Sequence, residues 1–211
     1  MLEPLTAYRL VRGKTRCHPY IADICTYFAV TFDGVASRLG YSQSDDSHVV
    51  MACPGANADI ALPLKGFADG VIEGGSPDEI IVRYERKGPS PNGKGAPGME
   101  GLTGRVVSAI FSLFVERGND RMRHNIGKQV SEWPPTSNFC RVVRNAIVHG
   151  GTINLNSETA TGGEWRHLKY DYRHNGKHIL NDGDLGIGDL VVLMLEMEAD
   201  LINLNAPVDL G

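Results

Sequence analysis

The sequence is poor in the cysteine patterns that define metal-binding and disulfide-rich proteins. Its four cysteines include no pair spaced as Cys-x-x-Cys, and they are Cys17, Cys25, Cys53 and Cys140. This spacing excludes a zinc ribbon and a disulfide framework. We therefore expect free, buried thiols without a chemical role, as is usual in a reducing compartment. We also expect no bound metal and no cofactor.

Long apolar runs are missing as well. The longest strongly apolar run, Leu190 to Leu195, ends at Glu196 and is far shorter than the roughly 20 residues that a membrane-spanning helix needs. The first residues, Met1 to Pro4, lack the basic and then apolar pattern of a signal peptide. The sequence therefore predicts a soluble cytoplasmic protein with no membrane association.

Positive charge is scarce overall, because 21 Lys and Arg face 25 Asp and Glu, for a net charge of −4. That balance argues against a protein that coats nucleic acid with its whole surface. The charges are unevenly distributed, however. Residues 105–149 hold seven Lys and Arg against three Asp and Glu, whereas residues 150–211 hold four against ten. A basic surface for an anionic partner is therefore expected only from residues 105–149.

The sequence is rich, by contrast, in helical periodicity. Four segments place apolar residues three or four positions apart, and they are 19–40, 103–118, 136–149 and 188–204. Glycine closes or follows three of them, as is common where a helix ends. The 211 residues suffice for one good-sized core. We therefore predict a single, mainly α-helical domain over residues 1–211, built as a four-helix bundle.

Residues 41–98 differ from the rest because turn-forming residues interrupt them repeatedly, ending in a Pro/Gly-rich loop over 88–98. Three short segments lie between the turns: 48–53, a candidate helix over 58–71, and 79–86, which fits a strand or a helix. We expect this part to be an irregular insert after the first helix that packs on the core. Residues 1–16, with four basic residues, are expected to form a short lead-in helix.

A β-hairpin is expected before the last helix. Leu168, Tyr170 and Tyr172 alternate with polar residues, as in a half-exposed strand. Asn175-Gly176 is a pair favoured in hairpin turns, after which the chain would return through 178–180. Three histidines lie along this segment, His167, His174 and His178. Their spacing favours exposed hairpin histidines over metal ligands, because no fitting fourth ligand accompanies them.

The segment 136–149 carries the candidate functional site. At about 100° per residue, its core-facing side is apolar and consists of Phe139, Val142, Val143, Ala146 and Ile147. The opposite arc gathers polar residues, namely Arg141, Arg144, Asn145 and His149. Val148 lies in the middle of this polar arc, where a solvated face rarely places a β-branched residue. This suggests that the face contacts another surface, such as a second copy of the chain.

The polar arc matches the needs of phosphodiester cleavage. Arg144 supplies a permanent positive charge and a planar fork for a scissile phosphate, and His149 supplies a proton donor or acceptor near neutral pH. Asn145 can orient the imidazole or a ribose hydroxyl, and Arg141 is a candidate phosphate contact by the same helical geometry. No Asp or Glu stands nearby in the segment to bind Mg²⁺, which favours a metal-independent mechanism.

The pattern Arg144-x4-His149, with a polar residue directly after the arginine and a helix around both, resembles the Arg-x(4–6)-His motif of the HEPN superfamily. The context also resembles the family: VVRNAIVHGG is followed by a hairpin, an NDGDL stretch and a final apolar helix, over roughly residues 100–205. The resemblance implies a four-helix bundle that commonly dimerises and brings the motifs of two protomers into one cleft. Arg144 would stabilise the phosphate, His149 would act in acid–base catalysis, and Asn145 would support them.

Many members of this superfamily are metal-independent endoribonucleases of toxin–antitoxin, CRISPR and phage-defence systems. The resemblance therefore implies cleavage of RNA by attack of its own 2′-hydroxyl, which leaves a 2′,3′-cyclic phosphate. The implied partners are RNA, a second copy of the chain, and an antitoxin or other partner protein. An alternative is a non-catalytic HEPN-like module for dimerisation, nucleotide binding or partner interaction. A third is an α-helical protein whose exposed helix face is polar only because it meets water.

Overall fold

The computed structural model describes residues 6–39, 48–64, 66–67, 76–86, 99–180 and 184–204. The helices of this part of the chain are α1 (His18–Leu39), α3 (Met99–Asn125), α4 (Pro135–Val148) and α5 (Ile187–Asn203). The strands are β1 (Thr6–Val11), β2 (His48–Cys53), β3 (Ala58–Pro63), β4 (Glu79–Arg86), β5 (Gly163–Trp165) and β6 (Leu168–Tyr170). Two short 3-10 helices are η1 (Val130–Glu132) and η2 (Tyr172–His174).

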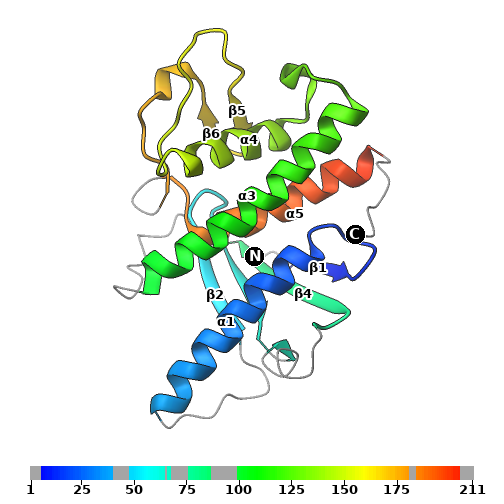
Figure 1. Ribbon diagram of the computed structural model, residues 1–211, viewed down its shortest axis with the longest axis vertical. Coiled ribbons are helices and arrows are strands. Elements are labelled where there is room, and N and C mark those ends of the chain that lie inside the picture. Colours follow the sequence, from blue (N-terminus) through cyan, green and yellow to red (C-terminus); the bar gives the residue numbers. More distant parts are fainter. Residues whose placement is uncertain are drawn as a thin grey trace.

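The predicted mainly α-helical four-helix bundle is wrong. Strands β1 to β4 form an antiparallel sheet in the order β1-β4-β3-β2, and β5 pairs with β6 in a second sheet. The protein is therefore a mixed α/β structure. Figure 1 shows α3 crossing in front of α5, with α4 and the small sheet on one side and α1 with the four-stranded sheet on the other.

The segment predicted to be an irregular insert supplies three strands of the larger sheet. Within the candidate helix over 58–71, residues 58–63 are instead β3, and within the lead-in helix over 1–16, residues 6–11 are instead β1. These segments form strands because their apolar residues recur every second position. Ile60 and Leu62 in β3 are buried, as are Ile80 and Val82 in β4, while the residues between them are more exposed. Such alternation turns one face of a sheet to the core and the other to water. The Pro/Gly-rich loop predicted over 88–98 lies outside the described residues.

Helix α5 is the centre of the core, and its predicted position is confirmed. It packs against α3, α4, β2 and β3. Two buried carboxylates tie other segments to it. Asp189 accepts hydrogen bonds from the backbone N–H groups of Gly55 and Ala56 at 3.1 and 2.9 Å, which fixes the β2–β3 turn. Glu198 accepts the N–H groups of Arg16 and Cys17, both at 3.0 Å, which fixes the start of α1.

The helices predicted around residues 19–40 and 136–149 are confirmed as α1 and α4, whereas α3 is longer than predicted. The helix does not end at Gly118 but continues to Asn125. A side chain at position 118 would collide with Met197 of α5. Gly118 therefore allows α3 and α5 to approach closely, and it is not a helix terminator here. None of the helices in the described ranges combines the length and apolarity that crossing a bilayer would require.

The hairpin before α5 exists, but its turn is not the predicted one. Strands β5 and β6 pair with Trp165 opposite Leu168, and the turn lies at Arg166, whose φ is 55°. Tyr172 belongs to η2 rather than to a strand. Asn175-Gly176 therefore turns the chain after η2 and does not join the paired strands. The small sheet is docked on α4 because Phe139 stacks on Tyr170 with ring centroids 5.2 Å apart.

Candidate functional site

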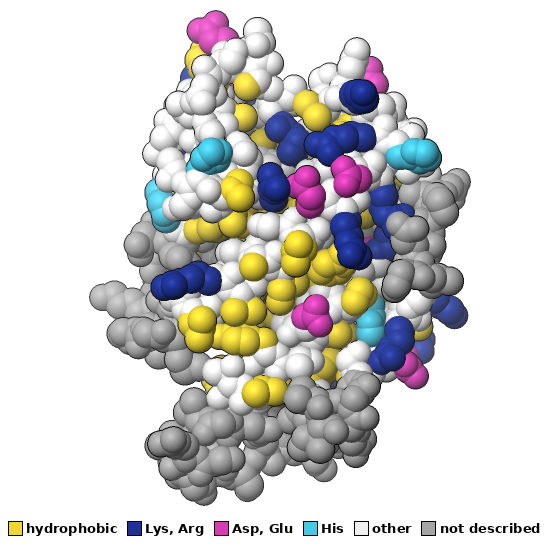
Figure 2. All heavy atoms as spheres, viewed as in Figure 1, with side chains coloured by type: hydrophobic (Ala, Val, Ile, Leu, Met, Phe, Trp, Pro, Cys, Tyr) yellow, Lys and Arg dark blue, Asp and Glu magenta, His cyan; other side chains and the backbone are white. Residues whose placement is uncertain are grey.

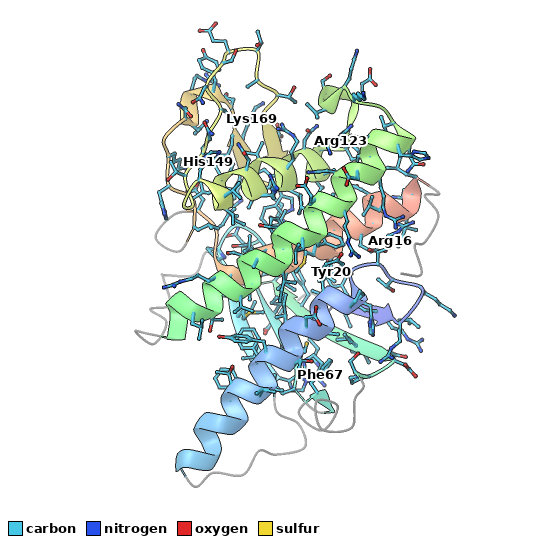
Figure 3. The ribbon with its side chains drawn as sticks, in the orientation of Figure 1. Arg16, Tyr20, Phe67, Arg123, His149 and Lys169 are labelled. Carbon is cyan, nitrogen blue, oxygen red and sulfur yellow. The ribbon has the colours of Figure 1, made fainter. Side chains whose placement is uncertain are left out.

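The end of α4 presents the Arg144-x4-His149 motif at the surface. The helix stops after Val148 because Gly150 and Gly151 adopt φ angles of 72° and 86°, which favour glycine. The N–H of Gly151 donates to the carbonyl of Ala146 at 2.8 Å, so the last turn is closed by the chain itself. His149 is consequently exposed just past the helix end, as labelled in Figure 3.

The side chain of Arg144 is partly exposed and forms an ion pair with α3. Its guanidinium Nη2 lies 2.8 Å from Oε2 of Glu116, and the two side chains are 33% and 46% exposed. The Nε atom of Arg144 is buried and has no hydrogen-bond partner among the described residues. The segment 136–149 holds no acidic residue near the motif, but α3 brings Glu116 to it. A partly exposed ion pair of this kind contributes little to stability. An anionic ligand can therefore compete with Glu116 for the guanidinium at little cost.

Asn145 and His149 lie on the other flank of α4, where both contact Asn154. Asn145 Nδ2 donates to the backbone carbonyl of Asn154 at 3.1 Å. The side-chain oxygen of Asn154 accepts a hydrogen bond from Asn156 at 2.6 Å, so its amide nitrogen faces the imidazole. That nitrogen lies 2.7 Å from His149 Nε2. The contact engages Nε2, and the tautomer of the ring decides which of the two groups donates, so Nδ1 is the ring nitrogen that faces away from Asn154.

Arg141 is occupied by protein groups. Its Nη2 donates to the backbone carbonyl of Thr161, and its Nε donates to Oδ1 of Asn138 at 3.3 Å. Burial lowers the pKa of the Arg141 guanidinium from its usual value. Together with Asn145, Arg141 holds the segment between Gly151 and β5 against α4. The four polar residues of the predicted arc therefore fall into three environments.

A groove of about 790 Å³ lies between α3, the end of α4 and the start of α5. Arg144 lines it, together with Glu116, Val148, His178 and other residues, whereas His149 does not. Its rim is apolar: Val148 is 59% exposed, and Leu113 of α3 is 63% exposed. Figure 2 shows this face of the molecule, on which hydrophobic side chains gather along α3 with Lys, Arg and His side chains around them. We call this feature the α3–α4 groove.

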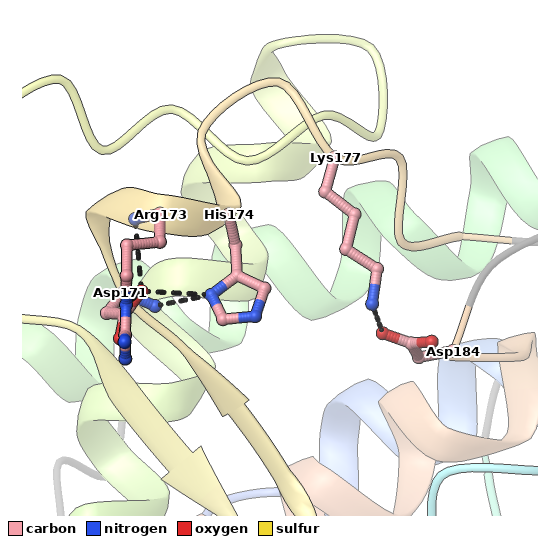
Figure 4. A network of polar contacts seen from close by, with 5 residues as sticks. All are labelled: Asp171, Arg173, His174, Lys177 and Asp184. Carbon is pink, nitrogen blue, oxygen red and sulfur yellow. Dashed lines mark hydrogen bonds and ion pairs between the residues drawn. The ribbon is translucent and has the colours of Figure 1, made fainter.

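A separate polar network surrounds η2 (Figure 4). Asp171 accepts hydrogen bonds from the N–H and side chain of Arg173, and it lies 3.0 Å from His174 Nδ1. The hydrogen bonds from Arg173 hold the pKa of the Asp171 carboxyl well below its usual range. Lys177 pairs with Asp184 in the same region. These contacts give His174 a structural role, and no cluster suited to a metal ion is found in the described residues.

Three contributors to the site come from outside the motif helix and were not predicted from the sequence. Glu116 reaches Arg144 from α3, Asn154 joins Asn145 to His149, and His178 lines the groove beside Arg144. Only His178 had been noted, as an exposed hairpin histidine. No local pattern marks Glu116 or Asn154, because their roles depend on how the segments pack.

In comparisons with protein-family models, with curated proteins and with solved structures, nothing matches this chain. The motif and its surroundings are therefore the whole basis of the likeness to the HEPN superfamily.

Proposed function

We propose that the chain is a metal-independent endoribonuclease that works as a homodimer, as the HEPN resemblance suggests. The observation that carries the proposal is the exposed end of α4, where Arg144 and His149 flank the exposed apolar side chain of Val148. The two polar residues leave the helix on different flanks and contact different neighbours. A twofold contact across Val148 would bring Arg144 of one protomer towards His149 of its partner. The complete site then requires two chains.

The chemistry follows from the residue types. The Arg144 guanidinium neutralises charge on the scissile phosphate, and the ribose 2′-oxygen attacks phosphorus. The P–O5′ bond breaks, which leaves a 2′,3′-cyclic phosphate and a 5′-hydroxyl. His149 Nδ1, the ring atom not engaged by Asn154, accepts the proton of the 2′-hydroxyl, and the imidazolium then returns a proton to the O5′ leaving oxygen. Asn145 and Asn154 hold the imidazole in place.

The test is incubation of the purified protein with mixed RNA in EDTA. We expect cleavage by the wild type and its loss in Arg144→Ala and His149→Ala. Arg123→Ala and His167→Ala are matched controls, because Arg123 also pairs with an acidic residue, Asp120, at 2.7 Å, and His167 is exposed. Equal cleavage by wild type and both motif variants would show that a contaminating nuclease is responsible. Mixing the two inactive variants is informative, since a composite site predicts partial recovery of activity in mixed dimers.

A second candidate is a non-catalytic module that dimerises or binds a protein partner through the same face. The observation that favours it is the exposed apolar surface at the α3–α4 groove, where Leu113 and Val148 are each more than half exposed. Single exposed apolar residues are common, but grouped ones mark interaction surfaces. Dimerisation without RNA cleavage in the assay above would favour this second candidate.

A further inference from the structure

Two side chains of the α3–α4 groove hold buried polar atoms with no hydrogen-bond partner. They are Oγ of Ser112 and Nε of Arg144, and both residues line the groove. A helical serine ordinarily bonds to a carbonyl one turn earlier or faces water. Buried polar groups in native proteins are nearly always bonded, and an exception calls for an explanation. Two such donors beside one groove would be satisfied by a ligand that supplies oxygen acceptors, once the two side chains turn towards it.

His178 adds a third polar group to the same groove. Neither of its ring nitrogens has a hydrogen-bond partner among the described residues, although the ring is closely placed. A Cβ built on Gly151 would lie 2.9 Å from His178 Nε2, so the ring packs directly against the end of α4. The backbone N–H of Ile179 donates to the carbonyl of Gly151 at 2.9 Å, which fixes the chain at His178. The position of the ring is therefore fixed by its neighbours, and its two nitrogens can form hydrogen bonds to a ligand.

The remaining lining indicates which part of an RNA would bind. Glycine, serine and aliphatic side chains make up most of it, and no Phe, Tyr or Trp is among the described residues that line the groove. The groups left for stacking on a base are the ring of His178 and the guanidinium groups of Arg105 and Arg144, and phosphate oxygens would engage two of these three. Arginine and hydroxyl groups suit phosphate oxygens. The volume of about 790 Å³ also suits a nucleotide-sized group.

We propose that the α3–α4 groove binds one phosphodiester of single-stranded RNA through Arg144, Ser112 and His178, without reading the base. This inference rests on the proposed function and adds two residues to its site. Arg144 and Ser112 donate to the phosphate oxygens, and His178 donates from the opposite wall, beside Gly151. His149, outside the groove, is left for proton transfer. The enzyme would consequently bind RNA of many sequences, with the backbone as the common feature.

The experiment measures fluorescence anisotropy of a labelled, single-stranded 2′-O-methyl RNA, which cannot undergo attack by its 2′-oxygen. Ser112→Ala and His178→Ala should each weaken binding about fivefold, the usual effect of one hydrogen bond. Arg144→Ala should weaken it further and make the log–log salt dependence shallower by about 0.7, since one phosphate contact is lost. Ser131→Ala, His167→Ala and Arg123→Ala are the matched controls and should bind as the wild type does.

Thermal melting separates binding from folding. Ser112→Ala removes a buried hydroxyl without a partner, so its melting temperature should stay the same or rise while its affinity falls. His178→Gln keeps a polar side chain and should bind between wild type and His178→Ala. Wild-type affinity in both Ser112→Ala and His178→Ala would overturn the proposal, as would failure of the wild type to bind RNA. Binding through the groove without cleavage of unmodified RNA would instead refute the endoribonuclease and leave this inference standing.

Discussion

Replacement of Glu116 by glutamine tests whether the ion pair restrains Arg144. The pair is exposed and has a 2.8 Å N–O distance, so its loss should cost less than about 1 kcal/mol of stability. In a protein of this size, that corresponds to a fall in melting temperature of at most about 4 °C. A phosphate on the far side of the guanidinium would lie about 6 Å from the carboxylate, where like charges in water repel by about 0.7 kcal/mol. Glu116→Gln should therefore bind RNA about threefold more tightly.

The assay is anisotropy with 2′-O-methyl RNA at low salt, because screening removes such effects at high salt. Asp120→Asn is the matched control, since Asp120 pairs with Arg123 on the same helix at 2.7 Å but does not line the groove. This control should leave the affinity unchanged. Weaker binding by Glu116→Gln would refute the argument, because it would mean that Glu116 orients Arg144 for the ligand and does not compete with it.

Three further changes test the site and the core. Gly150 and Gly151 both have positive φ, so alanine at either position should lower the free energy of unfolding by about 1–2 kcal/mol. Only Gly151→Ala should also weaken RNA binding, because its side chain would displace His178. Val148→Asp should leave the melting temperature nearly unchanged, since Val148 is exposed, yet should shift a homodimer towards monomer in sedimentation; an unchanged dimer would exclude Val148 from the interface. Burial raises the pKa of Asp189 to about 6, so the folded state favours the protonated carboxyl. The free energy of unfolding should therefore be highest below about pH 4 and should fall by about 2–3 kcal/mol as the pH rises through 6. Urea unfolding should show this loss in the wild type and not in Asp189→Asn.

The helices could be predicted because their core faces recur every three or four residues over long stretches. The sheet was missed because its strands are short and two of them mimic helices. The segment from Ala58 places apolar residues at 58, 60, 61, 62 and 64, which fits either period. Ile60 and Leu62 are buried in a sheet in which β3 pairs with β2 and β4. The turn from β2 to β3 is short, but β4 pairs with β1, where Glu79 lies opposite Val11. Strand pairing over that distance has no local signal.

The site was predictable to the extent that one helix defines it. Arg144, Asn145, His149 and Val148 could be placed on one exposed side of α4 from periodicity alone. The positions of Glu116 and His178 could not, because they depend on the packing of α3 and of the segment after η2. The same limit explains Gly118: glycine ends many helices, and only the presence of Met197 in the folded state shows that it serves close packing instead.

A shared helix face is therefore not the same as a shared site. The segment between Gly151 and β5 covers one flank of α4, and it engages Arg141 through Thr161 and Asn145 through Asn154. His149 contacts the same segment through Asn154, and it does not line the α3–α4 groove as Arg144 does. If a single protomer carried the whole activity, His149 would have to act across the end of α4. In the proposed homodimer this difficulty would disappear, because a twofold contact over Val148 would place the uncovered side of one motif against the groove side of the other.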